Sequence, residues 1–384
     1  MRGNIKKNVW YLGLVSFFTD VSSEMIFPIL PLFLTTVLKA NMAVIGVIEG
    51  IAESASSILK LFSGWLSDRL KKKKILIFSG YGLSTITKPL LALATSWWHV
   101  LFIRFFDRVG KGIRTVPRDA LIASSVKKGE RGKSFGIHRM MDSLGAIFGT
   151  IIASLLLAYF ANNFRLVFWL SFIPGLAALF IIILFVRDTK PEKKAEKKFS
   201  LNFKQFKPEF RKFLFVVAFF NMANFSYAFF ILRAKDTGHA LALIPIIYLV
   251  YNIFYASFSI PAGKLSDKIG RRNVLSIGFF LFALVAFGFA FMANLMTIWI
   301  LFALYGLFMA ITDGTSRAYV SDIVEENKRG SALGVYHSLV GITVLPANFI
   351  GGFLWNSVNV YAPFVYASII SVLSSILLLT MVKK

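Results

Sequence analysis

The sequence lacks cysteine entirely and contains only four histidines. Without cysteine, a disulfide, a thiolate metal site and a cysteine nucleophile are excluded. The histidines, His99, His138, His239 and His337, are scattered, without the spacing of a metal site or of a nucleophile and base pair. Neither a metal nor a cofactor is therefore expected, and an integral membrane enzyme is only a minor alternative.

Long polar stretches are also scarce in this chain of 384 residues, which is 57% hydrophobic, with a mean hydropathy of +0.68. That composition is too apolar for a soluble protein. Because a helix needs about 20 residues to cross a bilayer, we predict an all-α integral membrane protein with twelve membrane-spanning runs. They lie near 10–38, 42–66, 75–95, 97–118, 132–160, 164–186, 212–234, 240–262, 273–292, 295–316, 331–355 and 360–381.

Acidic residues are few, and the formal net charge is +24. In a soluble chain this charge would suggest a nucleic-acid partner, but here the basic residues gather at both termini and in every loop that joins an even run to the next odd one. The opposite loops hold only Lys39, Arg165 and Lys235. By the positive-inside rule, both termini are predicted to be cytoplasmic in a multi-pass protein of the cell membrane. No nucleic-acid partner is expected.

Two short segments are near copies of each other: Gly64 to Arg69 (GWLSDR) and Gly263 to Lys268 (GKLSDK), 199 positions apart. A second pair, the RGKSFG segment from Arg131 and the RGSALG segment from Arg329, has an offset of 198. Repeats at half the chain length predict two homologous six-helix bundles. We place them at 1–186 and 212–384, joined by a cytoplasmic linker at 187–211, and expect them to be related by a pseudo-two-fold axis.

With these repeats, the chain resembles the major facilitator superfamily over essentially its whole length. The two copies are similar to the superfamily's 2–3 loop signature: glycine, aspartate four residues later, then a basic run. The resemblance implies that Asp68 and Asp267 latch the cytoplasmic side by contacting helices of the opposite half. The gating residues it implies are Gly64, Asp68, Arg69, Gly263, Asp267 and Arg271.

The fourth run is similar to the family's helix 4 signature at Arg104 and Gly110, whereas Asp107 and Arg108 replace an amide and a glycine. On a helical wheel, the charged residues of this run fall within an arc of roughly 120°. They are Arg104, Asp107, Arg108, Lys111, Arg114 and Arg118. Charges inside a bilayer are costly unless paired or hydrated, so Arg104, Asp107, Arg108 and Lys111 are predicted to bind a substrate that has an anionic part.

Further acids and bases lie deep in other runs of the first half. Asp20 and Glu24 share one face of the first run, so we predict that they carry the coupling proton. Across the first half, the deep acids are Asp20, Glu24, Glu49, Glu53, Asp107 and Asp142, and the deep bases are Lys60, Lys88, Arg104, Arg108, Lys111, Arg114 and Arg139. Their near balance indicates a paired network.

In the second half, polar and aromatic side chains take the place of charges. Asn221, Asn224, Tyr251 and Tyr255 are predicted to contact the substrate. The tyrosines belong to a single helical face, which is either a wall that stacks on an organic substrate or a belt of packed tyrosines. Close packing of helices is predicted at Gly145 and Gly149 on the fifth run.

Together these features predict a secondary active transporter that moves a small organic, partly anionic solute by alternating access. We expect it to be proton-coupled, monomeric and capable of efflux. An uncoupled facilitator remains the alternative within transport.

Overall fold

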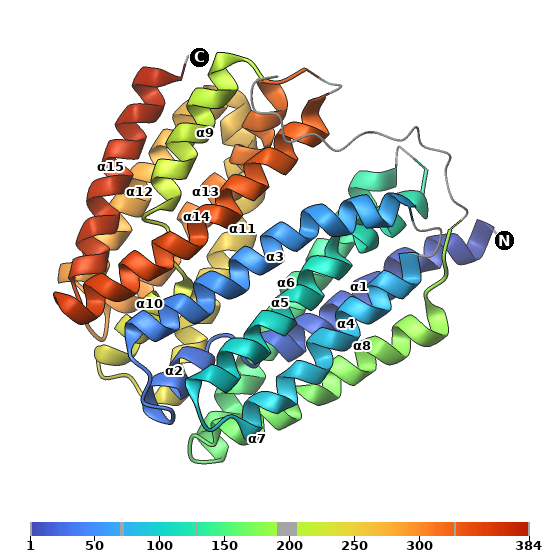
Figure 1. Cartoon of the computed structure of the whole chain (residues 1–384), viewed down its shortest axis with the longest axis horizontal. Helices are drawn as coiled ribbons and strands as arrows, with labels where there is room; N and C mark the ends of the chain where they lie inside the picture. Colours follow the sequence, from blue (N-terminus) through green and yellow to red (C-terminus); the bar gives the residue numbers. More distant parts are fainter. Residues whose placement is uncertain (1, 70–72, 128–129, 190–205, 326–327, 383–384) are drawn as a thin grey trace. The chain divides into compact units, whose positions relative to one another are not determined.

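The computed structural model describes residues 2–69, 73–127, 130–189, 206–325 and 328–382, without the side chains of 2–6, 61 and 64–69. The α-helices are α1 (Arg2–Glu24), α2 (Leu30–Thr36), α3 (Met42–Arg69), α4 (Lys73–Leu90), α5 (Trp97–Ser124), α6 (Arg131–Tyr159), α7 (Phe164–Leu170), α8 (Phe172–Phe185), α9 (Pro208–Asn221), α10 (Tyr227–Asp236), α11 (Ile244–Ile269), α12 (Arg271–Phe291), α13 (Thr297–Asp322), α14 (Arg329–Ser357) and α15 (Ala362–Met381). Two short 3-10 helices are η1 (Leu91–Leu93) and η4 (Leu241–Leu243). The all-α prediction is confirmed (Figure 1).

Each predicted run coincides with one helix or with consecutive helices. Among the described residues, nine helical stretches are long and apolar enough to cross a membrane. The runs outside that set are 10–38, 97–118 and 212–234. The first and the last are each divided between two helices, and the middle one, α5, carries the charged ladder.

The two divided runs are interrupted at corresponding places of the repeat, at 25–29 between α1 and α2 and at 222–226 between α9 and α10. Pro28 lies in the first break. In the second, Asn348 on α14 accepts a hydrogen bond from the backbone N–H of Ser226 at 2.8 Å, and the Ser226 hydroxyl caps the N-terminus of α10. Interrupted helices at equivalent positions of two halves often mark a transport site.

By their contacts, the residues form two compact units, a first unit of Met1–Lys39 with Ile51–Lys198 and a second unit of Ala40–Gly50 with Phe199–Lys384. The described part of α3 thus contributes to both units. The predicted linker at 187–211 lies largely outside the described residues, since 190–205 are not among them.

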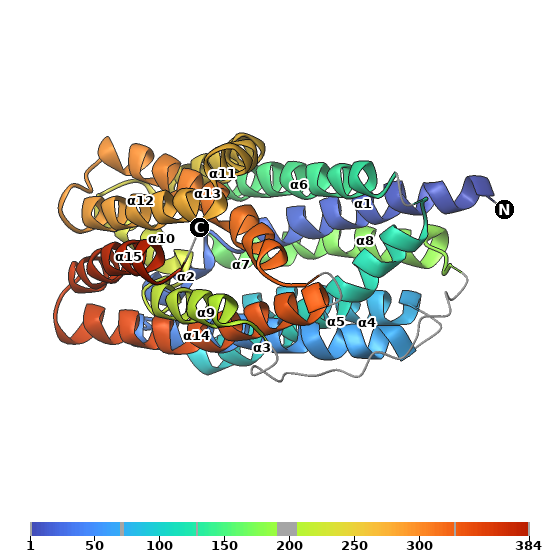
Figure 2. The same cartoon turned by 90° about the horizontal axis from the view of Figure 1, so that it is seen from above.

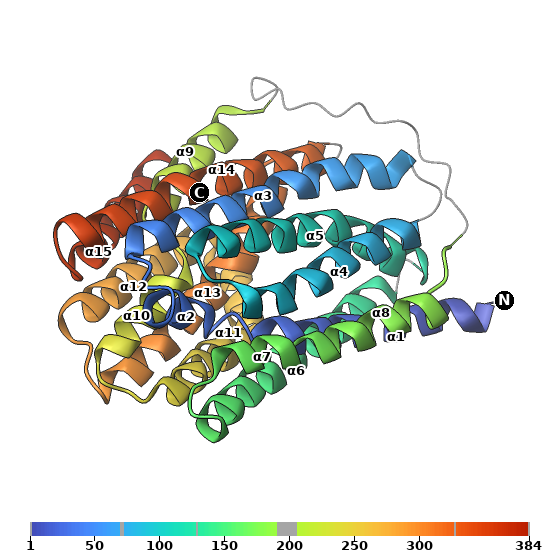
Figure 3. The same cartoon turned by 60° about the horizontal axis from the view of Figure 1, so that its bottom comes forward.

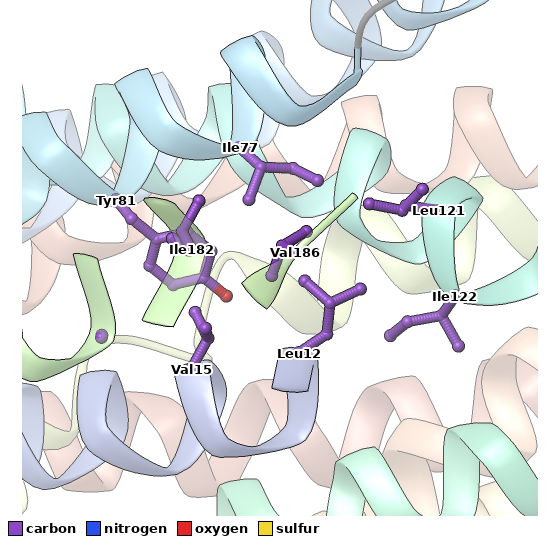
Figure 4. Close-up of a cluster of buried hydrophobic side chains, with 9 residues drawn as sticks. Leu12, Val15, Ile77, Tyr81, Leu121, Ile122, Ile182 and Val186 are labelled. Atoms are coloured by element: carbon purple, nitrogen blue, oxygen red, sulfur yellow. The ribbon is translucent and has the colours of Figure 1, made fainter. Parts of the chain in front are cut away.

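In the first unit, α1 packs against α6 and α8, and α4 packs against α5 (Figure 2). Four of these helices, α1, α4, α5 and α8, meet in an apolar cluster (Figure 4). Its buried members are Leu12, Val15, Ile77, Tyr81, Leu121, Ile122, Ala178, Ile182 and Val186. The cluster fixes the helices that carry the charged residues described below.

The contact between α1 and α6 depends on glycine, as the small residues of the fifth run predict. A Cβ atom at Gly145 would overlap the carbonyl oxygen of Phe17 and lie 3.0 Å from the Cβ of Asp20. One at Gly149 would lie 2.5 Å from the carbonyl oxygen of Val21 and 3.1 Å from the Cβ of Glu24. The two glycines therefore pack against the part of α1 that carries Asp20 and Glu24.

Gly145→Ala is expected to destabilise the protein by about 1–3 kcal/mol, because the added methyl forces two backbones apart. The matched control is Gly136→Ala on the same helix, where no described atom lies within 4 Å of an added Cβ. This control should leave stability unchanged or raise it, since alanine favours a helix. Thermal unfolding of both variants in detergent compares them. Equal midpoints would show that the contact tolerates a methyl.

In the second unit, α11 packs against α13, and α12 packs against α13 and α15 (Figure 3). Its core is rich in aromatic rings. Phe220 stacks on Phe279 with ring centroids 3.9 Å apart, and Phe230 stacks on Tyr305 at 4.4 Å. Stacked rings of this kind give the second unit an apolar core next to the few polar residues on α11 and α13.

Candidate functional site

The predicted ladder on α5 is largely buried and internally paired. Nη1 of Arg104 lies 3.4 Å from Oδ2 of Asp107, and the Ser84 hydroxyl of α4 donates a hydrogen bond to the other Asp107 oxygen. A Cβ at Gly110 would lie 2.5 Å from the carbonyl oxygen of Gly80, so two glycines let α4 and α5 approach this closely. Asp107, which stands where the family has an amide, thus has its charge paired with Arg104 and hydrogen-bonded to Ser84, both in the first unit.

Arg108 forms the shortest described ion pair of the ladder. Its Nη2 lies 2.6 Å from Oε1 of Glu53 on α3, with 2% of the arginine side chain and 34% of the glutamate side chain exposed. The remaining nitrogens of Arg108, Nε and Nη1, are buried and have no hydrogen-bond partner among the described residues. Glu53 therefore supplies the main compensation for a buried guanidinium.

Phe27, in the break between α1 and α2, lies beside both arginines. The Arg104 guanidinium carbon is 5.0 Å from the centre of its ring, and that of Arg108 is 4.8 Å away. A cavity of about 10 Å³ is lined by Phe27, Lys88, Arg104 and Asp107 together with Ile26, Thr87, Leu91 and Ile103. Such a space holds about one water molecule next to the charges.

The two carboxylates of α1 interact electrostatically with this network. The charges that act on Glu24 include Lys88, Arg108 and Lys111, and those that act on Asp20 include Asp142 of α6 and Lys111. Glu24 Oε2 is buried without a hydrogen-bond partner among the described residues.

Lys88 of α4 ties the same stretch of α1 to the network. Its Nζ donates to the Ser22 hydroxyl at 2.8 Å and approaches the Thr19 carbonyl oxygen at 3.5 Å. Despite these acids, the described residues include no group of three or more His, Asp or Glu side chains that could hold a metal ion.

In the second unit, the predicted substrate residues are divided between two places. Asn221 is buried at the end of α9, where its side-chain amide donates to the Val217 carbonyl oxygen at 2.9 Å, and Asn224 lies in the break that follows. Tyr251 and Tyr255 lie on α11, with ring centroids 6.2 Å apart. The structure therefore keeps the two tyrosines together and places both asparagines at the helix break.

The predicted gating residues are described only in the second copy. Gly64, Asp68 and Arg69 end α3, and their side chains lie outside the described residues. In the other copy, the end of α11 carries Gly263 and Asp267, and Arg271 begins α12. Nη2 of Arg271 lies 3.1 Å from Oδ1 of Asp267. The same arginine also forms an ion pair with Asp322 at the end of α13.

Comparison with known proteins agrees with this architecture. The family model of the Major Facilitator Superfamily matches residues 12–231 and 213–384. The chain belongs to the major facilitator superfamily. An uncharacterized MFS-type transporter of Methanocaldococcus jannaschii is 41% identical over 381 residues, covering 98% of this chain and 95% of that protein. Multidrug resistance protein MdtH of Photorhabdus laumondii is 23% identical over 315 residues, covering 80% of this chain and 77% of its own length.

Solved structures of this superfamily share the fold. A mutant of the nucleoside transporter NupG superimposes with a TM-score of 0.84 at 14% identity, covering 98% of this chain and 100% of NupG. A bacterial homolog of the human lysosomal transporter Spinster superimposes with a TM-score of 0.76 at 16% identity, covering 98% of this chain and 95% of the homolog. The resemblance read from the repeats is thereby confirmed, and the protein is a multi-pass membrane protein of a transporter family.

Sequence reasoning missed four residues that the structure brings to polar sites: Phe27 and Ser84 in the first unit, and Asp313 and Arg317 in the second. The repeat could have located the last two, because Arg114 and Arg118 lie 199 positions before them. No local pattern distinguishes Phe27 from the other 40 phenylalanines of the 41 in the chain.

Proposed function

We propose that this major facilitator protein is a secondary active transporter that moves a small organic, partly anionic solute by alternating access, coupled to protons. The observation that carries the proposal is the position of Asp20 and Glu24. These acids lie on the glycine contact with α6, and Lys111 acts on both of them. A carboxyl group in such a place can exchange a proton when its hydration and its cationic neighbours change between states.

Substrate binding is proposed for Arg104, Asp107, Arg108 and Lys111 on α5. In the first unit the bases exceed the acids along this helix, so an anionic group of the solute would balance them. Asn221, Asn224, Tyr251 and Tyr255 are proposed to contact its uncharged part. The similarity to proteins named multidrug resistance proteins favours export as the direction.

The function is tested with purified protein in liposomes. A thermal-shift screen of organic acids, siderophores, drugs and metabolites first identifies a ligand, and its flux is then measured with and without an imposed proton gradient. Saturable flux that follows the gradient supports the proposal. Flux that ignores it identifies an uncoupled facilitator, and saturable binding without flux indicates a receptor-like protein.

For the topology, we propose cytoplasmic termini and two bundles, 1–186 and 212–384, on either side of the linker. Because the chain has no cysteine, Lys328→Cys and Asn162→Cys each introduce one thiol. A membrane-impermeant maleimide should label Lys328→Cys only from the cytoplasmic side and Asn162→Cys only from outside. Labelling of both from the same side would overturn this topology.

For the gate, we propose that Asp68 and Asp267, with Gly64, Arg69, Gly263 and Arg271, hold the cytoplasmic side closed. Asp68→Asn should then favour the inward-facing state by about 1–3 kcal/mol, because a charge-assisted contact is lost. Single cysteines in the pathway report this shift as faster labelling from the cytoplasmic side. Unchanged labelling from both sides would remove the gating role.

A further inference from the structure

The second unit contains an ion pair that the proposed function does not use. Asp313 and Arg317 lie one turn apart on α13, and Nη2 of Arg317 is 2.5 Å from Oδ2 of Asp313. The hydroxyl of Tyr255 on α11 donates to the same oxygen at 2.6 Å. Tyr336 on α14 interacts electrostatically with both charged groups. Side chains from three helices of this unit therefore interact with one carboxylate.

Both partners of this ion pair are partly exposed, whereas the pair of Arg104 and Asp107 on α5 is buried. The exposed fractions of the side chains are 36% for Asp313 and 49% for Arg317. Asp313 lies within the predicted run 295–316 and Arg317 one position beyond it, in a helix that is long and apolar enough to span the membrane. Because exposing a charge to hydrocarbon costs several kcal/mol, we infer that this face of α13 lines a water-filled pathway.

Aromatic rings adjoin the carboxylate along α11 and α13. Tyr251 stacks on Tyr305 with ring centroids 4.9 Å apart, and on Tyr248 at 5.4 Å. Tyr255, which holds Asp313, continues the same stripe. Asp313 accepts from the hydroxyl of the last ring of this stripe, and a carboxylate and aromatic rings that lie close together can bind an organic cation, since both attract positive charge.

The internal repeat shows that Asp313 has no acidic counterpart in the first half. Arg114 and Arg118 of the first half correspond, at an offset of 199, to Asp313 and Arg317 of the second. Arg114 is buried with its guanidinium 4.3 Å from the centre of the Tyr81 ring. The second half thus has a partly exposed acid where the first half has a buried base.

We propose that Asp313 binds the cationic group of an organic solute, and that Arg317 is an internal counter-ion that holds the site when it is empty and is displaced on binding. Resting on the proposed function, this gives the transported solute a cationic group next to an aromatic or apolar body. The solute can displace Arg317 readily, because an ion pair that is exposed to water contributes little to stability.

The test measures equilibrium binding to the full-length protein in detergent, so it needs no gradient and its result is separate from that of the flux assay. The probe is tetraphenylphosphonium, with tetraphenylborate as the control of the same shape and opposite charge. Asp313→Asn should weaken phosphonium binding about tenfold, and Arg317→Gln should tighten it about threefold. Asp313→Glu, which keeps the charge, should bind like the wild type.

Opposite signs for these variants distinguish displacement from a structural ion pair. If Arg317→Gln weakens binding as Asp313→Asn does, the pair only supports the fold and the proposal is wrong. Absence of saturable phosphonium binding to the wild type also overturns it, as does equal weakening of borate binding in Asp313→Asn. Thermal unfolding without ligand confirms that each variant used in these comparisons is folded.

Discussion

Transport driven by a proton gradient is expected to fall to the level of empty liposomes in at least one of the variants Asp20→Asn and Glu24→Gln. An amide keeps the shape and the hydrogen-bonding capacity of the side chain but cannot bind and release the proton. Glu24 is the stronger candidate of the two, because one of its oxygens is buried without a hydrogen-bond partner among the described residues. A proton on this carboxyl group would remove a costly buried charge. Flux of the screened ligand in liposomes gives the readout.

The same variant should still exchange substrate across the membrane without a gradient, since exchange needs binding and alternation but no net proton movement. Glu209→Gln serves as the control, because Glu209 is an exposed acid in the first turn of α9. It should transport like the wild type. If both variants of α1 respond to the gradient normally, the proton is carried elsewhere and the coupling site proposed above is wrong.

Loss of Glu53 is expected to destabilise the protein by about 3–5 kcal/mol, the usual effect of removing one partner of a buried ion pair. Glu53→Leu leaves Arg108 charged, 2% exposed and without any described hydrogen-bond partner for two of its nitrogens. Arg108→Leu should cost less, because Glu53 is partly exposed and can be hydrated. The double variant should recover much of the loss, since apolar side chains need no partner. Unfolding of the three variants in detergent measures the cycle.

The exposed pair of Glu325 and Lys328, 3.0 Å apart, offers the control for this experiment. Glu325→Gln should leave the unfolding midpoint close to that of the wild type, as expected for a surface ion pair. Strictly additive effects of Glu53→Leu and Arg108→Leu would mean that the two side chains do not depend on each other, contrary to the observed geometry.

The membrane-spanning runs could be predicted from sequence because hydropathy is a local property. The interruptions could be predicted only in part. The break at 25–29 contains Pro28, which disfavours a continuous helix. The break at 222–226 contains neither proline nor glycine, and it is held instead by Asn348, which is 122 residues away from Ser226. A contact between residues so far apart in the chain cannot be predicted from a short stretch of sequence.

The candidate site shows the same distinction. Helical periodicity places the charged residues of α5 on one face, and the structure agrees that they form a network. Periodicity cannot say that Arg108 pairs with Glu53 while Asp107 takes Ser84, because those choices depend on how α3 and α4 pack against α5. It also cannot select Phe27, whose position follows from the break in the first run.

The division of α3 between the two units bears on attempts to produce the halves of this protein as separate polypeptides. Met42–Arg69 is one uninterrupted helix, yet Ala40–Gly50 belongs with the second unit. There, the Met42 backbone N–H donates to Asn356 Oδ1 at 3.3 Å, and a Cβ at Gly352 would lie 2.6 Å from the Met42 carbonyl oxygen. A fragment that begins after the linker would lack Ala40–Gly50 and would expose the surface of α14 around Gly352. If the chain is divided at the linker, both pieces would thus be needed in the same membrane, because the first piece carries Ala40–Gly50, which belongs to the second unit.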